Sequence, residues 1–463
     1  MTEMNASWSR KGGLLHPSSS EYAPIRFRSR AIAASLLLWS PNGANGVPIS
    51  GNAEVERADD GWHWVATWTS MPQLVEQSNM PPSPFTGGGG VFRDATLRQT
   101  LHLSIGGERL RIQISNTFGG SDLPISAASV ALPTGGKAGV PGVDSSTLKP
   151  LTFRNGSASI TIPRGQVAYT DPIDFRVDPQ SNIAITLYSQ AGQSGNSITG
   201  HPGSRTTSHM QSGNRVSAAT LSGGGNTKHW YFLSAVEAWS PPTTSALVIL
   251  GDSITDGRGS TDDANNRWPD LLLARMQKDG ASGGGGTTTT KLSQISVCNQ
   301  AAGGNTVLSG GLGPTLLSRY KRDALQVAGV RYVMVFEGVN DIGSGGTDSG
   351  SQNGIASRLQ QAFQQIVRDC KAAGLKTIGA TITPFGGNGQ AYSNPTREQT
   401  RVKVNDWILK SGAFDKTVDF AGMVADSAAK SQLASQYDGG DHLHLNVAGY
   451  QAMANGFPLG VFE

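Results

Sequence analysis

Alternating apolar and polar positions predict short strands in the first half of the chain. Over 97–105, Leu97, Leu101 and Leu103 share one parity, and over 109–115 Leu110, Ile112 and Ile114 alternate with polar residues. This is the pattern of strands with one buried face. Gly106-Gly107 between them has the composition of a hairpin turn. Further strands are expected at 158–163, 182–189 and 230–238. Such closely spaced strands, without a long helical pattern, predict a β-sandwich-like accessory domain over 62–240.

The pattern changes after Pro241-Pro242, where apolar strands begin to alternate with amphipathic helices. Continuous apolar runs predict strands at 246–250, 295–298, 331–336, 375–382 and 417–420. Apolar residues at helical spacing predict a helix over 356–373, and Asn394 with Pro395 can cap and open another over 395–411. This alternation predicts an α/β fold over 244–463, with a parallel sheet covered on both faces.

The amino-acid composition further restricts the fold class and the partners that we expect. Only 15% of the 463 residues are charged, compared with about 25% in typical proteins, and 60 are glycine. This profile is typical of β-rich structure with long polar loops. The net charge is +3, and the Lys and Arg residues form no basic stripe, so we expect no nucleic-acid partner. The two cysteines, Cys298 and Cys370, fit either two buried thiols or one disulfide.

The N-terminal segment has the pattern of a secretory signal. Three arginines within 26–30 precede an apolar run at 31–39, and small and polar residues follow at 40–44. The apolar run is too short to span a bilayer, which needs about 20 residues. We therefore predict that 1–60 is a leader and linker and that the protein is secreted, to the extracellular or periplasmic space. A disordered cytoplasmic leader is the alternative, and no stable membrane span is expected.

Polar residues gather where the predicted parallel strands end. Ser253 follows the first strand, Gly304 lies in a glycine-rich run after the second, and Asn340 follows the third. Ligands of open α/β sheets bind outside the carboxyl ends of the strands, so these residues should share one site. Asp441 and His444 lie near the C-terminus, before a predicted helix.

This set contains the groups that acyl transfer requires. A serine hydroxyl is a weak nucleophile, so Ser253 needs a base, and His444 can take its proton. Asp441 can orient the imidazole and stabilise its cation. The N–H groups of Ser253 and Gly304 and the side-chain amide of Asn340 can donate hydrogen bonds to an oxyanion. Each motif alone arises often by chance, and their order and shared location support the prediction.

The four motifs resemble those of the SGNH (GDSL-type) hydrolases. The matching runs are GDSITDG at 251–257, NQAAGGN at 299–305, GVND at 338–341 and DHLH at 441–444. The resemblance covers about 246–460 and implies a flavodoxin-like three-layer αβα fold. It implies a nucleophile (Ser253), two further triad residues (Asp441 and His444) and an oxyanion hole (Ser253, Gly304 and Asn340). The β region looks like the accessory domain of secreted GDSL-like lipase/acylhydrolase proteins.

The expected function is that of a serine esterase or acylhydrolase that cleaves carboxylic esters through an acyl-serine intermediate. The substrate is a small-molecule or polysaccharide ester, and the low aromatic content of 7% favours short-chain or carbohydrate O-acetyl esters. No metal or organic cofactor is expected, because the sequence has no metal-ligand cluster and no phosphate or dinucleotide motif. The alternatives are a carbohydrate-binding protein with an inactive hydrolase domain, and an acyltransferase.

Two further polar features are His442 and the loop 201–208. His442 is expected to be a loop residue that lines or flanks the cleft, because the spacing in Asp-x-x-His favours His444 as the base. The loop 201–208 either reaches the active site from the first domain or is an ordinary surface loop. The sequence leaves both possibilities open for this loop.

Overall fold

The computed structural model describes residues 61–281 and 292–463. The predicted leader and linker at 1–60 lies outside the described residues. Ala58–Glu463 belong to one compact unit, which contains a β region (residues 61–240) and an α/β region (residues 244–463). No helix within the described residues is both long and apolar enough to cross a membrane.

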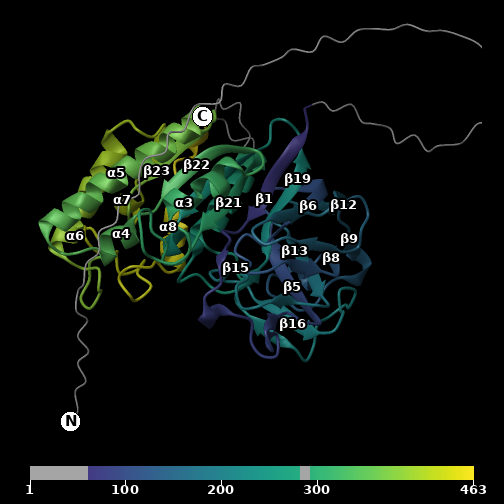
Figure 1. Ribbon diagram of the computed structural model, residues 1–463. Helices are drawn as coiled ribbons and strands as arrows, with labels where there is room; N and C mark the ends of the chain where they lie inside the picture. Colours follow the sequence, from purple (N-terminus) through teal and green to yellow (C-terminus); the bar gives the residue numbers. More distant parts are fainter. Residues whose placement is uncertain (1–60, 282–291) are drawn as a thin grey trace, which may run out of the picture. The chain divides into compact units, whose positions relative to one another are not determined.

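Two antiparallel sheets make up most of the β region (Figure 1). The first sheet contains β1 (His63–Thr69), β19 (Leu233–Ser240), β6 (Gly107–Ser115), β11 (Val167–Tyr169) and β12 (Ile173–Val177). The second has the order β17 (Gly225–Thr227), β16 (Ser208–Ser212), β5 (Ala95–His102), β13 (Asn182–Ser189), β8 (Ala127–Ala131) and β9 (Lys149–Leu151). Apolar side chains of both sheets share one core. The strand-rich character predicted for this region is confirmed, and its description as a sandwich stays a prediction.

Short strands complete the β region. They are β2 (Gln73–Leu74), β3 (Thr86–Gly87), β4 (Gly90–Val91), β7 (Leu123–Ile125), β10 (Ile160–Ile162), β14 (Gln193–Ser194), β15 (Thr199–His201) and β18 (Trp230–Tyr231). Strand β15 pairs with both β2 and β18. Strand β15 ends at His201, where the polar loop 201–208 begins.

The hairpin expected at Gly106-Gly107 is wrong. Strands β5 and β6 lie in different sheets, and the chain crosses from one to the other between them. Thr67 holds this crossing, because its hydroxyl donates to the carbonyl of Ile105 at 2.8 Å and accepts from the N–H of the same residue at 2.9 Å. A β-carbon at Gly106 would lie 2.7 Å from the carbonyl oxygen of Val177, so glycine serves close packing here.

A five-stranded parallel sheet forms the centre of the α/β region. Its order is β21 (Ile295–Ala301), β20 (Ser245–Gly251), β22 (Val330–Phe336), β23 (Lys376–Ala380) and β24 (Lys416–Val418). In chain order this is 2-1-3-4-5, the order of flavodoxin-like folds. Every residue of β20 is buried, which explains its uninterrupted apolar run. The α/β fold predicted for this region is confirmed.

Two groups of helices pack on this sheet. One contains α2 (Trp268–Ala281), α7 (Phe420–Val424) and α8 (Val447–Gly456), and the other α5 (Ser349–Ala372) and α6 (Pro395–Lys410). The fully buried ring of Trp268 contacts Phe336 of β22 and Phe420 of α7. Asn394 caps α6 as predicted, since its side chain accepts the N–H groups of Thr396 and Arg397. Cys298 and Cys370 are both buried and unpaired, which confirms two buried thiols.

Strand β1 contacts both regions and lies between β19 and β21 in Figure 1. The N–H of Ala66 donates to the carbonyl of Ala328 at 2.9 Å, and the Ser296 hydroxyl donates to the carbonyl of Ala66 at 2.6 Å. Ser104 of the β region donates to Val297 of β21 at 2.9 Å. These buried bonds join the β region to the edge strand of the parallel sheet.

Candidate active site

Ser253 lies just beyond the carboxyl end of β20. It is the first residue of α1 (Ser253–Asp256), which begins two residues after β20 ends at Gly251. The Asp252 side chain caps this turn by accepting the N–H of Ile254 at 3.0 Å. A β-carbon at Gly251 would lie 2.7 Å from the Thr255 side chain, so only glycine fits this tight strand-to-helix turn. The turn thus brings the hydroxyl to the edge of the sheet where ligands of such folds bind.

A hydrogen-bond chain connects Ser253 with two residues near the C-terminus. The Ser253 Oγ lies 2.8 Å from Nε2 of His444, and Nδ1 of His444 lies 2.7 Å from Oδ2 of Asp441. The other carboxylate oxygen of Asp441 accepts the backbone N–H groups of Leu443 at 3.1 Å and His444 at 2.8 Å. The structure therefore brings together the three residues that the sequence singled out for a triad.

The electrostatic surroundings leave His444 able to accept a proton. Burial lowers the pKa of His444 below its usual 6.5, and the hydrogen bond and charge of Asp441 oppose this effect. Burial tends to raise the pKa of Asp441, but hydrogen bonds from the backbone and side chain of His444 lower it overall. At neutral pH the imidazole is therefore neutral and the carboxylate is ionised, which is the combination that a general base needs.

Three N–H donors follow the carboxyl ends of β20, β21 and β22. Asn340, in α4 (Val339–Ser344), donates one amide hydrogen to the carbonyl of Asn305 at 2.7 Å, which leaves its second hydrogen available. Within residues 61–281 and 292–463, the backbone N–H groups of Ser253 and Gly304 have no acceptor. Gly304 has a φ of +68°, a conformation that favours glycine. These donors could stabilise an oxyanion beside Ser253.

Two residues that the sequence reasoning missed hold this arrangement. The Tyr392 hydroxyl donates to Oδ1 of Asn340 at 3.1 Å and so fixes the orientation of the amide. Asp341 accepts the N–H groups of Val307 at 2.8 Å and Leu308 at 2.9 Å and thereby holds the loop after Gly304. Asp341 adjoins the Asn340 motif and could have been found there. Tyr392 lies 52 positions beyond Asn340 in a loop without a recognisable motif.

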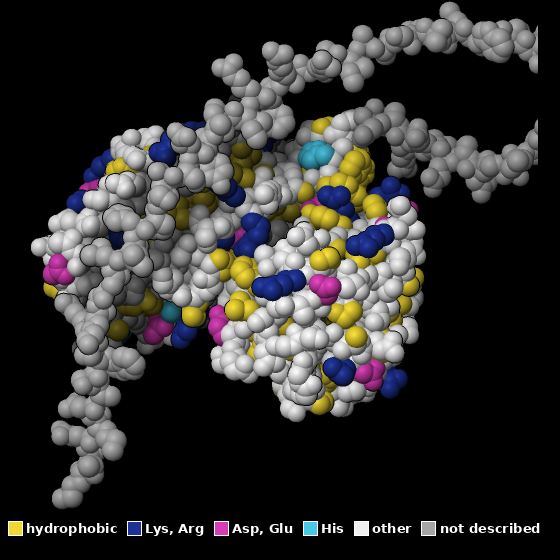
Figure 2. Space-filling view, viewed as in Figure 1, with side chains coloured by type: hydrophobic (Ala, Val, Ile, Leu, Met, Phe, Trp, Pro, Cys, Tyr) yellow, Lys and Arg dark blue, Asp and Glu magenta, His cyan; other side chains and the backbone are white. Residues whose placement is uncertain are grey.

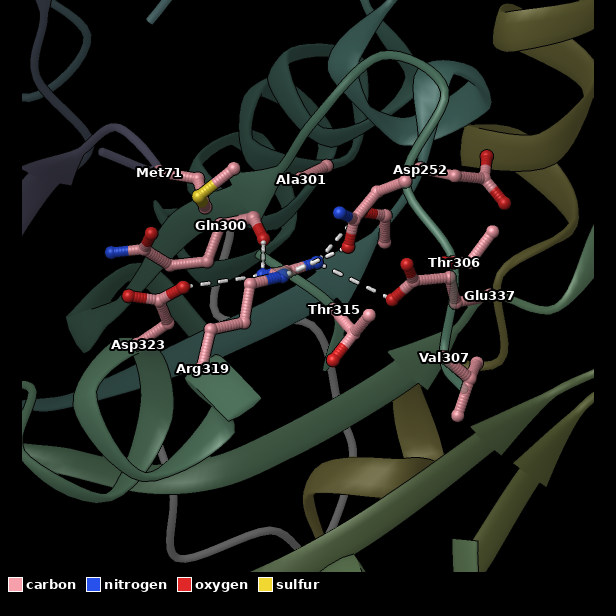
Figure 3. A network of polar contacts seen from close by, with 12 residues as sticks. Met71, Asp252, Gln300, Ala301, Thr306, Val307, Thr315, Arg319, Asp323 and Glu337 are labelled. Carbon is pink, nitrogen blue, oxygen red and sulfur yellow. Dashed lines mark hydrogen bonds and ion pairs between the residues drawn. The ribbon is translucent and has the colours of Figure 1, made fainter. Parts of the chain in front are cut away.

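A buried arginine joins the ends of three neighbouring strands, β21, β20 and β22 (Figure 3). Arg319, in α3 (Leu316–Tyr320), has a fully buried side chain. Its guanidinium donates to the carbonyl oxygens of Gln300 at 2.6 Å and Gly251 at 3.1 Å and to Oδ1 of Asn305 at 3.0 Å. It also pairs with Glu337 and Asp323, each at 3.3 Å. Lys321 and Arg322 follow Arg319 closely in the chain, so the sequence gives no signal that singles out Arg319 for this role.

The carboxyl groups around Arg319 are unusual because they are buried. Burial raises the pKa of Glu337 to about 8, although Arg319 opposes the shift. Burial also raises the pKa of Asp252 to about 7, against the hydrogen bond from Ile254. Glu337 and Asp252 therefore hold protons at pH values where exposed carboxyl groups have lost theirs.

The β region reaches the segment that follows Ser253. Nε2 of His201 lies 2.9 Å from Oδ1 of Asp256, and both side chains are almost fully buried. The loop 201–208 is therefore an interface loop and not an ordinary surface loop. His442 bonds to Asp438 at 2.5 Å and is 42% exposed, outside the hydrogen-bond chain of Ser253. Within the described residues, no group of His, Cys, Asp and Glu side chains has the arrangement of a metal site.

The sequence profile of the GDSL-like lipase/acylhydrolase family matches residues 249–452, a range that contains all four motifs. No curated protein sequence matches the chain. Among solved structures, an acetyl xylan esterase from Geobacillus stearothermophilus is 19% identical and covers 47% of this chain and 96% of its own, with a TM-score of 0.34. A GDSL-like lipase from Bacteroides thetaiotaomicron is 18% identical and covers 47% of this chain and 88% of its own, with a TM-score of 0.31. Residues 249–452 of the chain therefore form a domain of the GDSL-like lipase/acylhydrolase family.

Proposed function

We propose that the protein is a serine esterase that cleaves carboxylic esters through an acyl-serine intermediate. The observation that carries this proposal is the continuous hydrogen-bond chain from Ser253 through His444 to Asp441. A neutral imidazole at 2.8 Å from the hydroxyl is within the distance that proton transfer requires. The family of the domain supports the same reaction class.

In the first half of the reaction, Nε2 of His444 takes the Ser253 proton while Oγ bonds to the ester carbonyl carbon. The carbonyl oxygen becomes an oxyanion, which accepts hydrogen bonds from the N–H groups of Ser253 and Gly304 and from the Asn340 amide. When the tetrahedral intermediate collapses, the bond to the alcohol oxygen breaks and His444 returns the proton to the leaving alcohol. Asp441 remains ionised and stabilises the imidazolium.

In the second half, a water molecule attacks the acyl-serine carbonyl while His444 takes its proton. Collapse of the second tetrahedral intermediate releases the carboxylic acid and returns the proton to Ser253. The Asp441 carboxylate accepts hydrogen bonds from Nδ1 and from the backbone N–H of His444, and these bonds hold His444 in one orientation through both halves. The chain therefore supplies every proton-transfer group that the cycle needs.

The substrate class belongs to the same proposal. We propose short-chain esters or carbohydrate O-acetyl esters, on small molecules or polysaccharides, because only 7% of the chain is aromatic. Secretion through the N-terminal leader would bring the enzyme to such polysaccharides. Hydrolysis of p-nitrophenyl esters of increasing chain length, compared with acetyl release from acetylated xylan, tests this choice.

The decisive experiment replaces the nucleophile. Ser253→Ala should reduce p-nitrophenyl acetate hydrolysis by about 10⁴-fold or more, because loss of a triad serine leaves only oxyanion stabilisation and binding. The thermal unfolding midpoint of the variant should match that of the parent protein. Undiminished hydrolysis by Ser253→Ala would refute the proposal.

Two further assays separate the alternatives. A fluorophosphonate should label the parent protein and not Ser253→Ala, whereas an inactive, carbohydrate-binding protein would not be labelled. Product analysis in the presence of competing alcohols or sugars distinguishes hydrolysis from acyl transfer, because an acyltransferase would form new esters in preference to free acid.

A further inference from the structure

Asp256 connects three parts of the molecule through one buried carboxylate. It is the last residue of α1, the helix that begins at Ser253, and it is only 4% exposed. Its Oδ1 faces Nε2 of His201 in the β region at 2.9 Å. Its Oδ2 accepts the N–H of Gly303 at 3.0 Å, directly before the proposed oxyanion donor Gly304.

The His201 ring is held on both sides. Its Nδ1 lies 3.1 Å from the carbonyl oxygen of Met71, and its Nε2 faces the Asp256 carboxylate. Both partners are oxygen acceptors, so a hydrogen on either ring nitrogen has an acceptor. The ring also stacks on Trp230, with centroids 5.8 Å apart and an interplanar angle of 27°. These contacts give His201 one position, from which it orients Asp256.

Other residues of the loop 201–208 also contact the segment that follows Ser253. A β-carbon at Gly203 would collide with the Asp256 carboxylate, so the backbone approaches it as closely as glycine allows. Arg205 donates to the carbonyl of Ser260 at 2.7 Å. The N–H and hydroxyl of Thr207 donate to Asp263 at 2.6 and 2.8 Å. The β region is therefore anchored along the whole segment that follows Ser253.

We propose that the β region takes part in catalysis, and that His201, acting through Asp256, positions the loop that carries the oxyanion donor Gly304. The inference rests on the esterase function proposed above. Gly303 and Gly304 have no side chains to restrain them, so the direction of the Gly304 N–H depends on external anchors. The Asp256 carboxylate anchors the preceding peptide, and Asp341 anchors the following segment. His201 is thus a positioning residue and does not touch the ester.

His201→Ala should lower kcat by about 10-fold or more, because a displacement of about 1 Å in catalytic geometry can cost about 10²-fold. KM for p-nitrophenyl acetate should change less than about twofold, since the donor acts mainly in the transition state. Rates are measured per active site titrated with a fluorophosphonate, which removes any unfolded fraction. Inhibition by phenylboronic acid, whose tetrahedral serine adduct places an oxygen near the oxyanion donors, should weaken by the same factor.

Two variants serve as matched comparisons. His201→Gln can still donate to Asp256 and should recover part of kcat, and it also covers the case in which His201→Ala does not fold. Asp263→Ala breaks contacts of the same loop without touching Gly303, so it should keep the parent kcat per titrated site. A loss of kcat in His201→Ala that Asp263→Ala reproduces would overturn the inference, because it would show general loosening of the interface.

Hydrogen–deuterium exchange provides a readout that does not depend on activity. The amides of the segment 299–305 should exchange faster in His201→Ala than in the parent protein and in Asp263→Ala. Unchanged exchange in this segment would overturn the positioning role even if the enzyme proved to have another activity. Failure of the esterase function itself would instead be seen as equal hydrolysis by the parent and Ser253→Ala.

Discussion

At the scale of single residues, the charge on His444 should control the reaction. Burial holds the pKa of His444 below 6.5, so its imidazole is mostly neutral at pH 7 and above. We expect kcat/KM for p-nitrophenyl acetate to be constant near neutral pH and to fall as His444 gains a proton, with a midpoint below pH 6.5. Initial rates across this range measure the midpoint, and a midpoint well above 6.5 would contradict the assignment.

Asp441 offers a direct check on the cause of that midpoint. Its charge and hydrogen bond raise the pKa of His444 against the effect of burial. Asp441→Asn should therefore move the acid midpoint to lower pH, in addition to reducing kcat by about 10³–10⁴-fold. If the midpoint stayed in place in this variant, a group other than His444 would be responsible for it.

At the scale of elements, capping and tight turns place the site residues and stabilise the helices around them. Asn394 caps α6 through the N–H groups of Thr396 and Arg397. Asn394→Ala should lower the free energy of unfolding by about 1 kcal/mol, because it leaves helix N–H groups without an acceptor. Urea unfolding measures the change. Asn394→Asp keeps an acceptor and should stay close to the parent protein, so equal losses in both variants would argue against the capping role.

At the scale of the whole molecule, two ionisable groups are fully buried beneath the site. On the face shown in Figure 2, basic and acidic side chains are scattered among neutral ones. In contrast, Arg319 and Glu337 have fully buried side chains beneath the site. The pKa of Glu337 rises from 4.5 in an exposed carboxyl group to about 8 in the folded protein. The folded state therefore binds a proton that the unfolded chain releases between these pH values.

This difference in proton binding stabilises the folded state more at low pH than at high pH. The contribution of Glu337 to stability is full below about pH 4.5 and is lost as the pH rises through about 8. Glu337→Gln should make the free energy of unfolding fall less steeply over this interval. Urea unfolding at several pH values measures this pH dependence. If the free energy of unfolding changed equally with pH in the two proteins, a raised pKa at Glu337 would be excluded.

The sequence by itself determined the elements and the chemistry of the site. Apolar runs, strand-like segments and capping residues are local features of the sequence, so they predicted β13, β22 and α6 closely. Ser253, Gly304 and Asn340 could be named because strand ends of a parallel sheet meet at one edge, and Asp441 and His444 from their motif before the last helix.

Only the tertiary structure decided which distant parts meet. The pairing of β5 and β6 with other strands, the Tyr392 bond to Asn340, and the contacts of Arg319 with three strand ends all join residues whose spacing carries no pattern. The same holds for His201 and Asp256, which are 55 positions apart and come from different regions. Local sequence encodes which face of an element is buried, whereas the partner of a buried polar group is fixed only when the elements pack.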